Sequence, residues 1–143
     1  MVGVIFSIIA GAAMSFQGVF NTRLGDKIGY FETNAFVQGT AFALSLIALI
    51  WGSKGAFREI VNADKIYLLG GVLGLIITLT VMLGIRDLSP TVSISIILIA
   101  QLLVAAVIDA FGLFGSEKVV FGWSKYLGIA LMIGGVVLFK YKK

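Results

Sequence analysis

The chain has 143 residues, of which 59% are hydrophobic and 13% are charged, and its mean hydropathy is +1.08. A soluble domain is about 25% charged, so this composition excludes a water-soluble fold and indicates an integral membrane protein. The absence of histidine and cysteine removes the commonest general base, the commonest metal ligand and any disulfide bond. We therefore expect no metal, no cofactor and no catalytic residue.

Five stretches are apolar enough to cross a membrane, which requires about 20 residues of helix. They are residues 2–24, 33–51, 66–86, 90–114 and 123–139. Trp and Tyr prefer the membrane interface, and here all of them lie at or just beyond the ends of these stretches. The sequence therefore predicts an all-α integral membrane protein, a single domain over residues 1–143 with five transmembrane helices. The first stretch is expected to be retained, because no basic residue precedes its apolar run.

The longest connection covers residues 52–64, and its segment 56–61 mixes charged with apolar side chains. Two interpretations stay open for this segment. It forms either a short helix on the membrane surface or a solvated loop.

The basic residues are divided almost evenly between the two membrane faces, five against six. They are Lys54, Arg58, Lys65, Lys118 and Lys125 on the face of the N-terminus, and Arg23, Lys27, Arg86, Lys140, Lys142 and Lys143 on the other. An excess of basic residues normally marks the cytoplasmic face, so this balance leaves two hypotheses. Either the C-terminal lysines fix one orientation, or the chain inserts in both orientations and pairs with an inverted copy of itself. Because the charges lie at span ends on both faces, the net charge of +4 does not indicate nucleic-acid binding.

An odd number of spans suits an inverted pair. Many transporters consist of two inverted repeats around a site at the midplane of the membrane. We therefore expect this chain to be one half of a five-plus-five inverted-repeat transporter.

Glycine allows membrane helices to approach closely, and several of the 18 glycines lie within the predicted spans. Seven are candidates for helix packing or for hinges: Gly11, Gly18, Gly70, Gly71, Gly74, Gly134 and Gly135. Close contact is the preferred interpretation for each. The pairs 70–71 and 134–135 are the better candidates for hinges.

Four amide side chains inside the spans are candidates for a solute cavity: Gln17, Asn21, Gln38 and Gln101. Such side chains are costly in a bilayer and usually face a partner or a cavity. At about 1.5 Å per residue, Gln17 and Gln38 each lie roughly 8–11 Å inside the same membrane surface, where they could meet. The alternatives are hydrogen bonds between helices for the glutamines and capping of the first helix by Asn21.

Two carboxylates are candidates for cation binding or proton coupling. Asp109 is the one clear charge inside a span, about one turn from the end of the fourth stretch, and Glu32 begins the second. Asp109 could instead reach the interface, or pair with Lys118 or Lys125. Glu32 could simply be a solvated interfacial residue.

The order of these residues resembles the drug/metabolite transporter superfamily, and more closely its five-helix YdcZ branch. The matching stretches are residues 17–25, 37–40, 69–74, 100–101 and 108–115, with shorter matches at 127–128 and 134–136. The most specific are the pair Gln17 and Asn21 and the segment that begins at Asp109. The resemblance implies a bacterial inner-membrane transporter of small molecules, in which the first four helices line the path and the fifth is peripheral. It implies no particular substrate.

The function expected is that of a small-molecule secondary transporter, an antiparallel homodimer that works by alternating access. Its partners would be an inverted copy of itself or a paralogous five-helix unit, the lipid bilayer and a small solute. The alternative is a structural or regulatory membrane subunit that transports nothing, in which the polar residues only join helices. An enzyme is not expected, since a single intramembrane carboxylate offers no acid–base pair.

Overall fold

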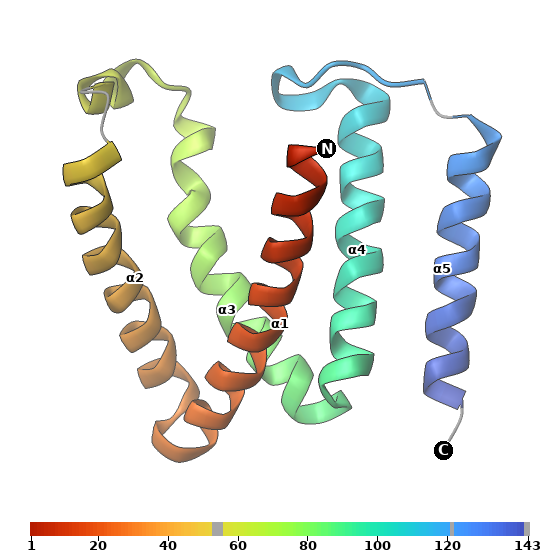
Figure 1. Cartoon of the computed structure of the whole chain (residues 1–143), viewed down its shortest axis with the longest axis horizontal. Helices are drawn as coiled ribbons and strands as arrows, with labels where there is room; N and C mark the ends of the chain where they lie inside the picture. Colours follow the sequence, from red (N-terminus) through yellow and green to blue (C-terminus); the bar gives the residue numbers. More distant parts are fainter. Residues whose placement is uncertain (53–55, 121, 142–143) are drawn as a thin grey trace. The chain divides into compact units, whose positions relative to one another are not determined.

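The computed structural model describes residues 1–52, 56–120 and 122–141. Its long helices are α1 (Val2–Ile28), α2 (Tyr30–Gly52), α3 (Gly70–Leu88), α4 (Pro90–Phe111) and α5 (Trp123–Tyr141) (Figure 1). The described parts of the connections contain three 3-10 helices, η1 (Ala56–Asn62), η2 (Lys65–Leu69) and η3 (Leu113–Gly115). The prediction of an all-α protein with about five helices is confirmed.

The helices have the length and composition of membrane spans. Within the described residues, four stretches are long and apolar enough to cross a bilayer: Val2–Ile28, Tyr30–Gly52, Lys65–Leu88 and Pro90–Phe111. A shorter apolar stretch, Trp123–Phe139, lies in α5. Among the described residues, Met82 and Ile85 are the only buried hydrophobic side chains. Lipid chains are as apolar as leucine, so side chains facing them gain little from burial inside the protein.

A single residue, Gly29, connects α1 to α2. Its φ is 100°, a backbone conformation that favours glycine, and its N–H donates to the carbonyl oxygen of Gly25 at 2.9 Å. α1 therefore extends four residues beyond Leu24, the predicted end of the first span. Hydropathy falls at the charged residues that follow Leu24, but the helical hydrogen bonds continue through them as far as Ile28.

The helix α4 ends three residues before the predicted end of the fourth span. α4 begins at Pro90, as expected for a residue that needs no N–H partner in a first helical turn. It ends at Phe111 because Gly112 adopts the left-handed conformation, with φ 64°, and donates its N–H to the carbonyl oxygen of Ile108. This is a common way for glycine to end a helix.

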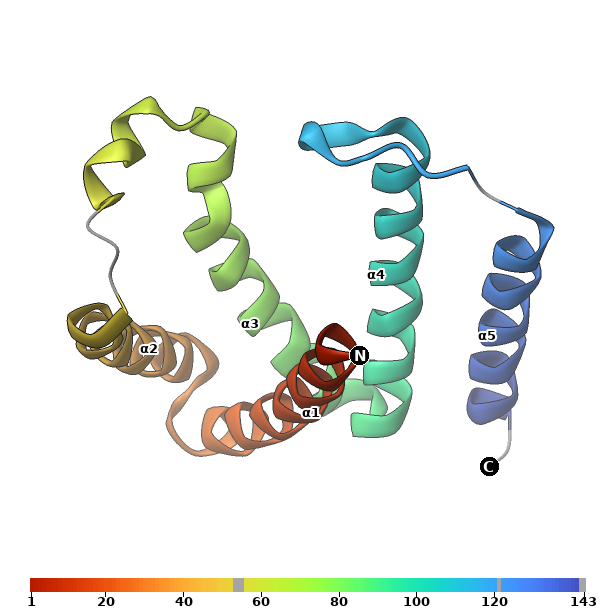
Figure 2. The same cartoon turned by 45° about the horizontal axis from the view of Figure 1, so that its top comes forward.

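Backbone contacts divide the chain into two compact units, which we describe separately: residues 1–87 and residues 88–143. In the first unit, α1 and α2 form a V, and α3 passes beside the C-terminal half of α1 (Figures 1 and 2). In the second unit, α4 and α5 lie side by side. That the whole chain forms one domain stays a prediction.

The contact between α1 and α3 depends on the absence of a side chain at Gly18. A Cβ atom at this position would lie 2.8 Å from Cδ1 of Ile85 and 3.1 Å from Cγ1 of Val81. One turn further on, the hydroxyl of Thr22 donates to the carbonyl oxygen of Gly18 at 2.7 Å and lies 3.4 Å from that of Met82. Glycine therefore lets the two backbones approach.

The substitution Gly18→Leu is expected to lower the free energy of unfolding by about 1–3 kcal/mol, the usual cost of overpacking a close contact. Gly11→Leu is the matched control, because it lies seven residues earlier in α1 and a Cβ there would meet nothing within 4 Å. Thermal unfolding in detergent measures the difference. Equal unfolding temperatures for the two variants would contradict the contact.

A group of charged and aromatic side chains attaches the end of α3 to the α1–α2 turn. The hydroxyl of Tyr30 donates to Oδ1 of Asp26 at 2.6 Å, and the guanidinium of Arg86 lies 5.3 Å from the centre of the Tyr30 ring. Arg86 also pairs with Asp87 at 2.7 Å. Because both partners of this ion pair are exposed, we expect it to contribute little stability.

The segment Ala56–Asn62 forms η1, which agrees with the short-helix interpretation of the longest connection. Its position on a membrane surface stays a prediction. Four of the lysines counted in the charge balance have no described side chain. Lys54, Lys142 and Lys143 lie outside the described residues, and so does the side chain of Lys140.

Candidate functional site

Asn21 is buried in the first unit. Its side chain lies in α1 and is only 7% exposed. Because α1 continues for seven residues beyond it, to Ile28, Asn21 does not cap the helix, and that alternative is wrong. A buried amide within a membrane helix normally has a polar partner or faces a cavity.

Gln17 and Gln38 differ in their exposure within the first unit. Gln17 is exposed on α1, whereas Gln38 is half-buried on α2. A Cβ added at Gly74 of α3 would lie 3.4 Å from Nε2 of Gln38, so this amide packs against α3. In the described part of the chain no hydrogen bond joins the two glutamines. Along their helices Gln17 lies about 16 Å and Gln38 about 12 Å from the α1–α2 turn at 1.5 Å per residue, and the depth of each in the membrane stays a prediction.

Two buried polar residues of α2 were missed by the sequence analysis. Thr33 is fully buried and Asn34 is 5% exposed. Within the described residues, Oγ1 of Thr33 and Oδ1 of Asn34 have no hydrogen-bond partner. Leaving such an atom unpartnered costs about 1–3 kcal/mol, so both oxygens are candidates to accept a hydrogen bond from water, a solute or another chain. Their only signal in the sequence is a polar pair at the start of the second predicted span.

Glu32 is exposed in the first turn of α2. Its carboxyl group covers the turn, since a Cβ at Gly29 would lie 2.9 Å from Cδ of Glu32. A negative charge is favourable at the N-terminus of a helix. This arrangement favours the interfacial interpretation of Glu32, and its role in coupling stays a prediction.

Two of the seven candidate glycines lie at helix contacts, Gly18 against α3 and Gly74 against Gln38. For the other five, a Cβ would meet nothing within 4 Å; they are Gly11, Gly70, Gly71, Gly134 and Gly135. These five are open to a neighbouring helix of another chain. Their roles in packing or as hinges stay predictions.

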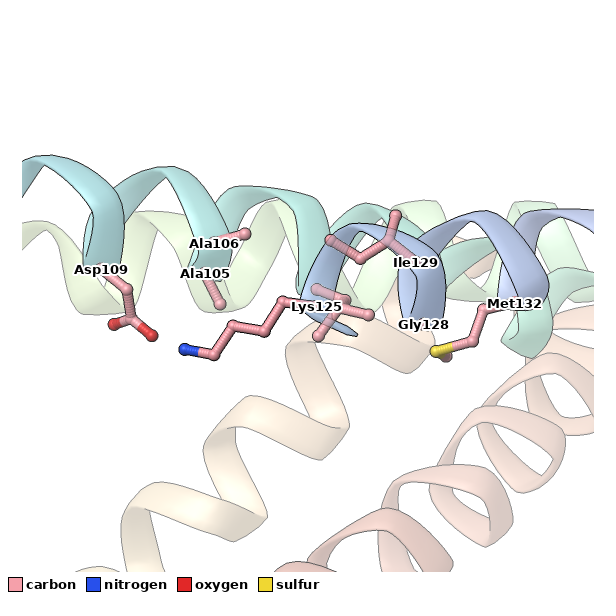
Figure 3. A pocket seen from close by; sticks show the side chains of 8 residues that line it. Ala105, Ala106, Asp109, Lys125, Gly128, Ile129 and Met132 are labelled. Carbon is pink, nitrogen blue, oxygen red and sulfur yellow. The ribbon is translucent and has the colours of Figure 1, made fainter. Parts of the chain in front are cut away.

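A pocket of about 490 Å³ lies between α4 and α5 in the second unit. It is lined by Leu102, Ala105, Ala106, Asp109, Lys125, Gly128, Ile129 and Met132. In Figure 3 the carboxylate of Asp109 and the ammonium group of Lys125 point toward one another. The structure thus brings together the acid and one of the two lysines that the sequence offered as its partner.

The main chain of Asp109 is held by the segment that follows α4. Its carbonyl oxygen accepts a hydrogen bond from the N–H of Val119 at 2.9 Å. Lys118, the other lysine considered as a partner, precedes Val119 in the sequence. It lies beside Gly112, because a Cβ added at Gly112 would be 3.5 Å from the Cβ of Lys118. Gln101 lies two turns before Asp109 on α4, is exposed, and does not line the pocket.

Several apolar helices of membrane-spanning length define the chain as a multispan helical membrane protein. A family described as "Putative inner membrane exporter, YdcZ" matches residues 2–138. The chain belongs to the YdcZ family. This membership gives it a transporter role in a membrane and points away from an enzyme. No curated protein and no solved structure matches the chain.

Proposed function

We propose that the chain is a secondary transporter that exports small molecules as an antiparallel homodimer in a bacterial inner membrane. The family match over residues 2–138 supports export. The even division of basic residues, five against six, supports insertion in both orientations. Two inverted copies then form the ten-helix arrangement that a five-helix chain lacks by itself.

The observation that carries this proposal is the exposure of two amides within apolar helices. Gln17 on α1 and Gln101 on α4 are both exposed within their own units. An amide that faces lipid chains loses its hydrogen bonds to water without replacement, which is unfavourable. Each amide therefore requires a polar neighbour, and a second copy of the chain or a bound solute supplies one.

Alternating access requires that the solute site faces each side of the membrane in turn. In an inverted pair, every residue of one copy recurs at a mirrored depth in the other. Gln17, Asn21, Gln38 and Gln101 of the two copies would then surround a central cavity, and Asp109 would lie toward each opening. Rocking of one copy against the other exposes this cavity on alternate faces.

The purified chain alone is expected to transport. A thermal-shift screen against metabolites and cationic drugs identifies compounds that bind only the folded state and so raise its stability. The strongest of these compounds is then tested for flux into liposomes that contain only this protein. Flux above that of protein-free liposomes supports the proposal. A folded chain that gives none would favour a non-transporting subunit or one half of a heterodimer.

A further inference from the structure

The pocket between α4 and α5 has a charged end and an apolar end. Asp109 and Lys125 lie at one end, and Leu102 of α4 and Met132 of α5 are each seven residues deeper, about 10 Å along their helices. Asp109 is near the end of α4 and Lys125 near the start of α5, so both charges are close to the same membrane surface. The pocket therefore runs from the interface toward the interior of the bilayer.

Small residues create the space in this pocket. Ala105 and Ala106 line it on α4, and Gly128 lines it on α5. A Cβ at Gly128 would meet nothing within 4 Å, so the space continues up to the backbone of α5. The volume of about 490 Å³ lies within the range of about 300–1,000 Å³ that is usual for small-ligand sites.

We propose that this pocket binds the head group and upper acyl chains of a phospholipid that carries both a primary ammonium and a phosphate, namely phosphatidylethanolamine. The lipid ammonium would donate to the carboxylate of Asp109, and the lipid phosphate would accept from the ammonium of Lys125. Charge-assisted hydrogen bonds of this kind are stronger than hydrogen bonds between neutral groups. The acyl chains would lie over the alanines and Met132. This assignment does not depend on transport by the chain.

A lipid fits this pocket better than a water-soluble zwitterion. The walls beyond the two charges are apolar, formed by Leu102, Ile129 and Met132. A soluble zwitterion would leave these walls uncovered, whereas a lipid from the surrounding bilayer covers them with its chains. Basic pockets between membrane helices are known to bind lipid head groups. Here the carboxylate of Asp109 would in addition select a head group that carries a hydrogen-bond donor, such as an ammonium group.

Fluorescence of a tryptophan introduced into the pocket lining by Met132→Trp reports on lipid in the pocket. Trp51→Phe and Trp123→Phe remove the two native tryptophans. The protein is reconstituted in bilayers with increasing fractions of a brominated lipid, which quenches tryptophan on contact. Brominated phosphatidylethanolamine, phosphatidylcholine and phosphatidylglycerol are compared. The lipid fraction that gives half of the full quenching is expected to be about tenfold lower for phosphatidylethanolamine than for phosphatidylcholine, the factor that one charge-assisted hydrogen bond provides.

Three variants separate the contributions of the pocket. Asp109→Asn is expected to abolish the preference for phosphatidylethanolamine, since it removes the negative charge but keeps the shape. Lys125→Met is expected to weaken quenching by phosphatidylethanolamine and phosphatidylcholine equally, because both carry the phosphate. Gly128→Leu fills the pocket and removes the preference. Gly134→Leu, the same change in α5 away from the pocket lining and with open space at its Cβ, is the control that keeps the preference.

Three results would overturn the proposal. The first is equal quenching by the three lipids in the Met132→Trp protein, as expected for a pocket that takes a soluble zwitterion or in which Asp109 and Lys125 bind only one another. The second is a preference for phosphatidylglycerol, which would place the selectivity outside this pair of charges. The third is a preference for phosphatidylethanolamine that survives Gly128→Leu, which would place the selectivity outside the pocket.

Discussion

Two variants of the chain that insert in opposite orientations are expected to be inactive when expressed alone and active when expressed together. The proposed transporter needs one copy in each orientation. A cell that contains only one orientation can form no inverted pair, so export falls to the level of cells without the protein. Co-expression restores pairs in which every copy has an inverted partner, and export returns.

The even charge balance makes the orientation easy to fix. The double substitution Lys65→Ser and Lys118→Ser leaves three basic residues on the face of the N-terminus against six on the other. The triple substitution Lys140→Ser, Lys142→Ser and Lys143→Ser leaves five against three. Because the face richer in basic residues stays in the cytoplasm, the two variants should insert in opposite orientations.

Reporters fused to the C-terminus measure the orientation, and export of a compound found by the stability screen measures function, both in intact cells. The unmodified chain should give reporter signal from both sides of the membrane. Signal from one side alone would disprove insertion in both orientations. Full export by either fixed variant alone would disprove the inverted homodimer.

Gln101→Leu is expected to reduce flux by up to about tenfold while the assembly of the protein is unchanged. If Gln101 binds the solute, its loss removes a hydrogen bond worth up to about 1.5 kcal/mol, which corresponds to about a tenfold change in affinity. If Gln101 only joins helices, its loss costs about 0.6 kcal/mol on average. The leucine itself suits a lipid environment, so the variant should fold.

Flux into liposomes and cross-linking of the dimer separate these two roles of Gln101. Thr80→Val is the matched control, because Thr80 is also exposed within a span but its hydroxyl bonds to the carbonyl oxygen of Ile76 in its own helix. This control should leave flux unchanged. Normal flux in Gln101→Leu, or a dimer that dissociates with it, would favour the role in helix association.

The helices could be predicted from hydropathy because a bilayer requires long apolar segments whatever the details of the sequence. The starts of α4 at Pro90 and of α5 at Trp123 agree with the prediction. The ends were less certain, because a helix ends where its hydrogen bonds end. α1 passes its charged residues and stops at Gly29, and α4 stops at Gly112, in each case at a glycine with positive φ.

The candidate site was harder to predict than the helices. Asp109 could be connected to Lys125 because both lie near one span end, where few partners exist. The buried oxygens of Thr33 and Asn34 could not be recognised, because burial at the start of a span depends on how neighbouring helices pack and hydropathy carries no information about it. For the same reason the contact of Gln38 with α3 could not be predicted.

The one-residue connection at Gly29 has a consequence for the biogenesis of the protein. α1 and α2 have no polar loop between them, so the chain leaving the ribosome presents them to the insertion machinery as a single helical hairpin. Both helices then take their orientation in one event, and Arg23 and Lys27 near the tip cross the membrane together or stay behind together. Under the proposed insertion in both orientations, we expect a newly made chain to commit to one of them at this early step, before α3 is synthesised.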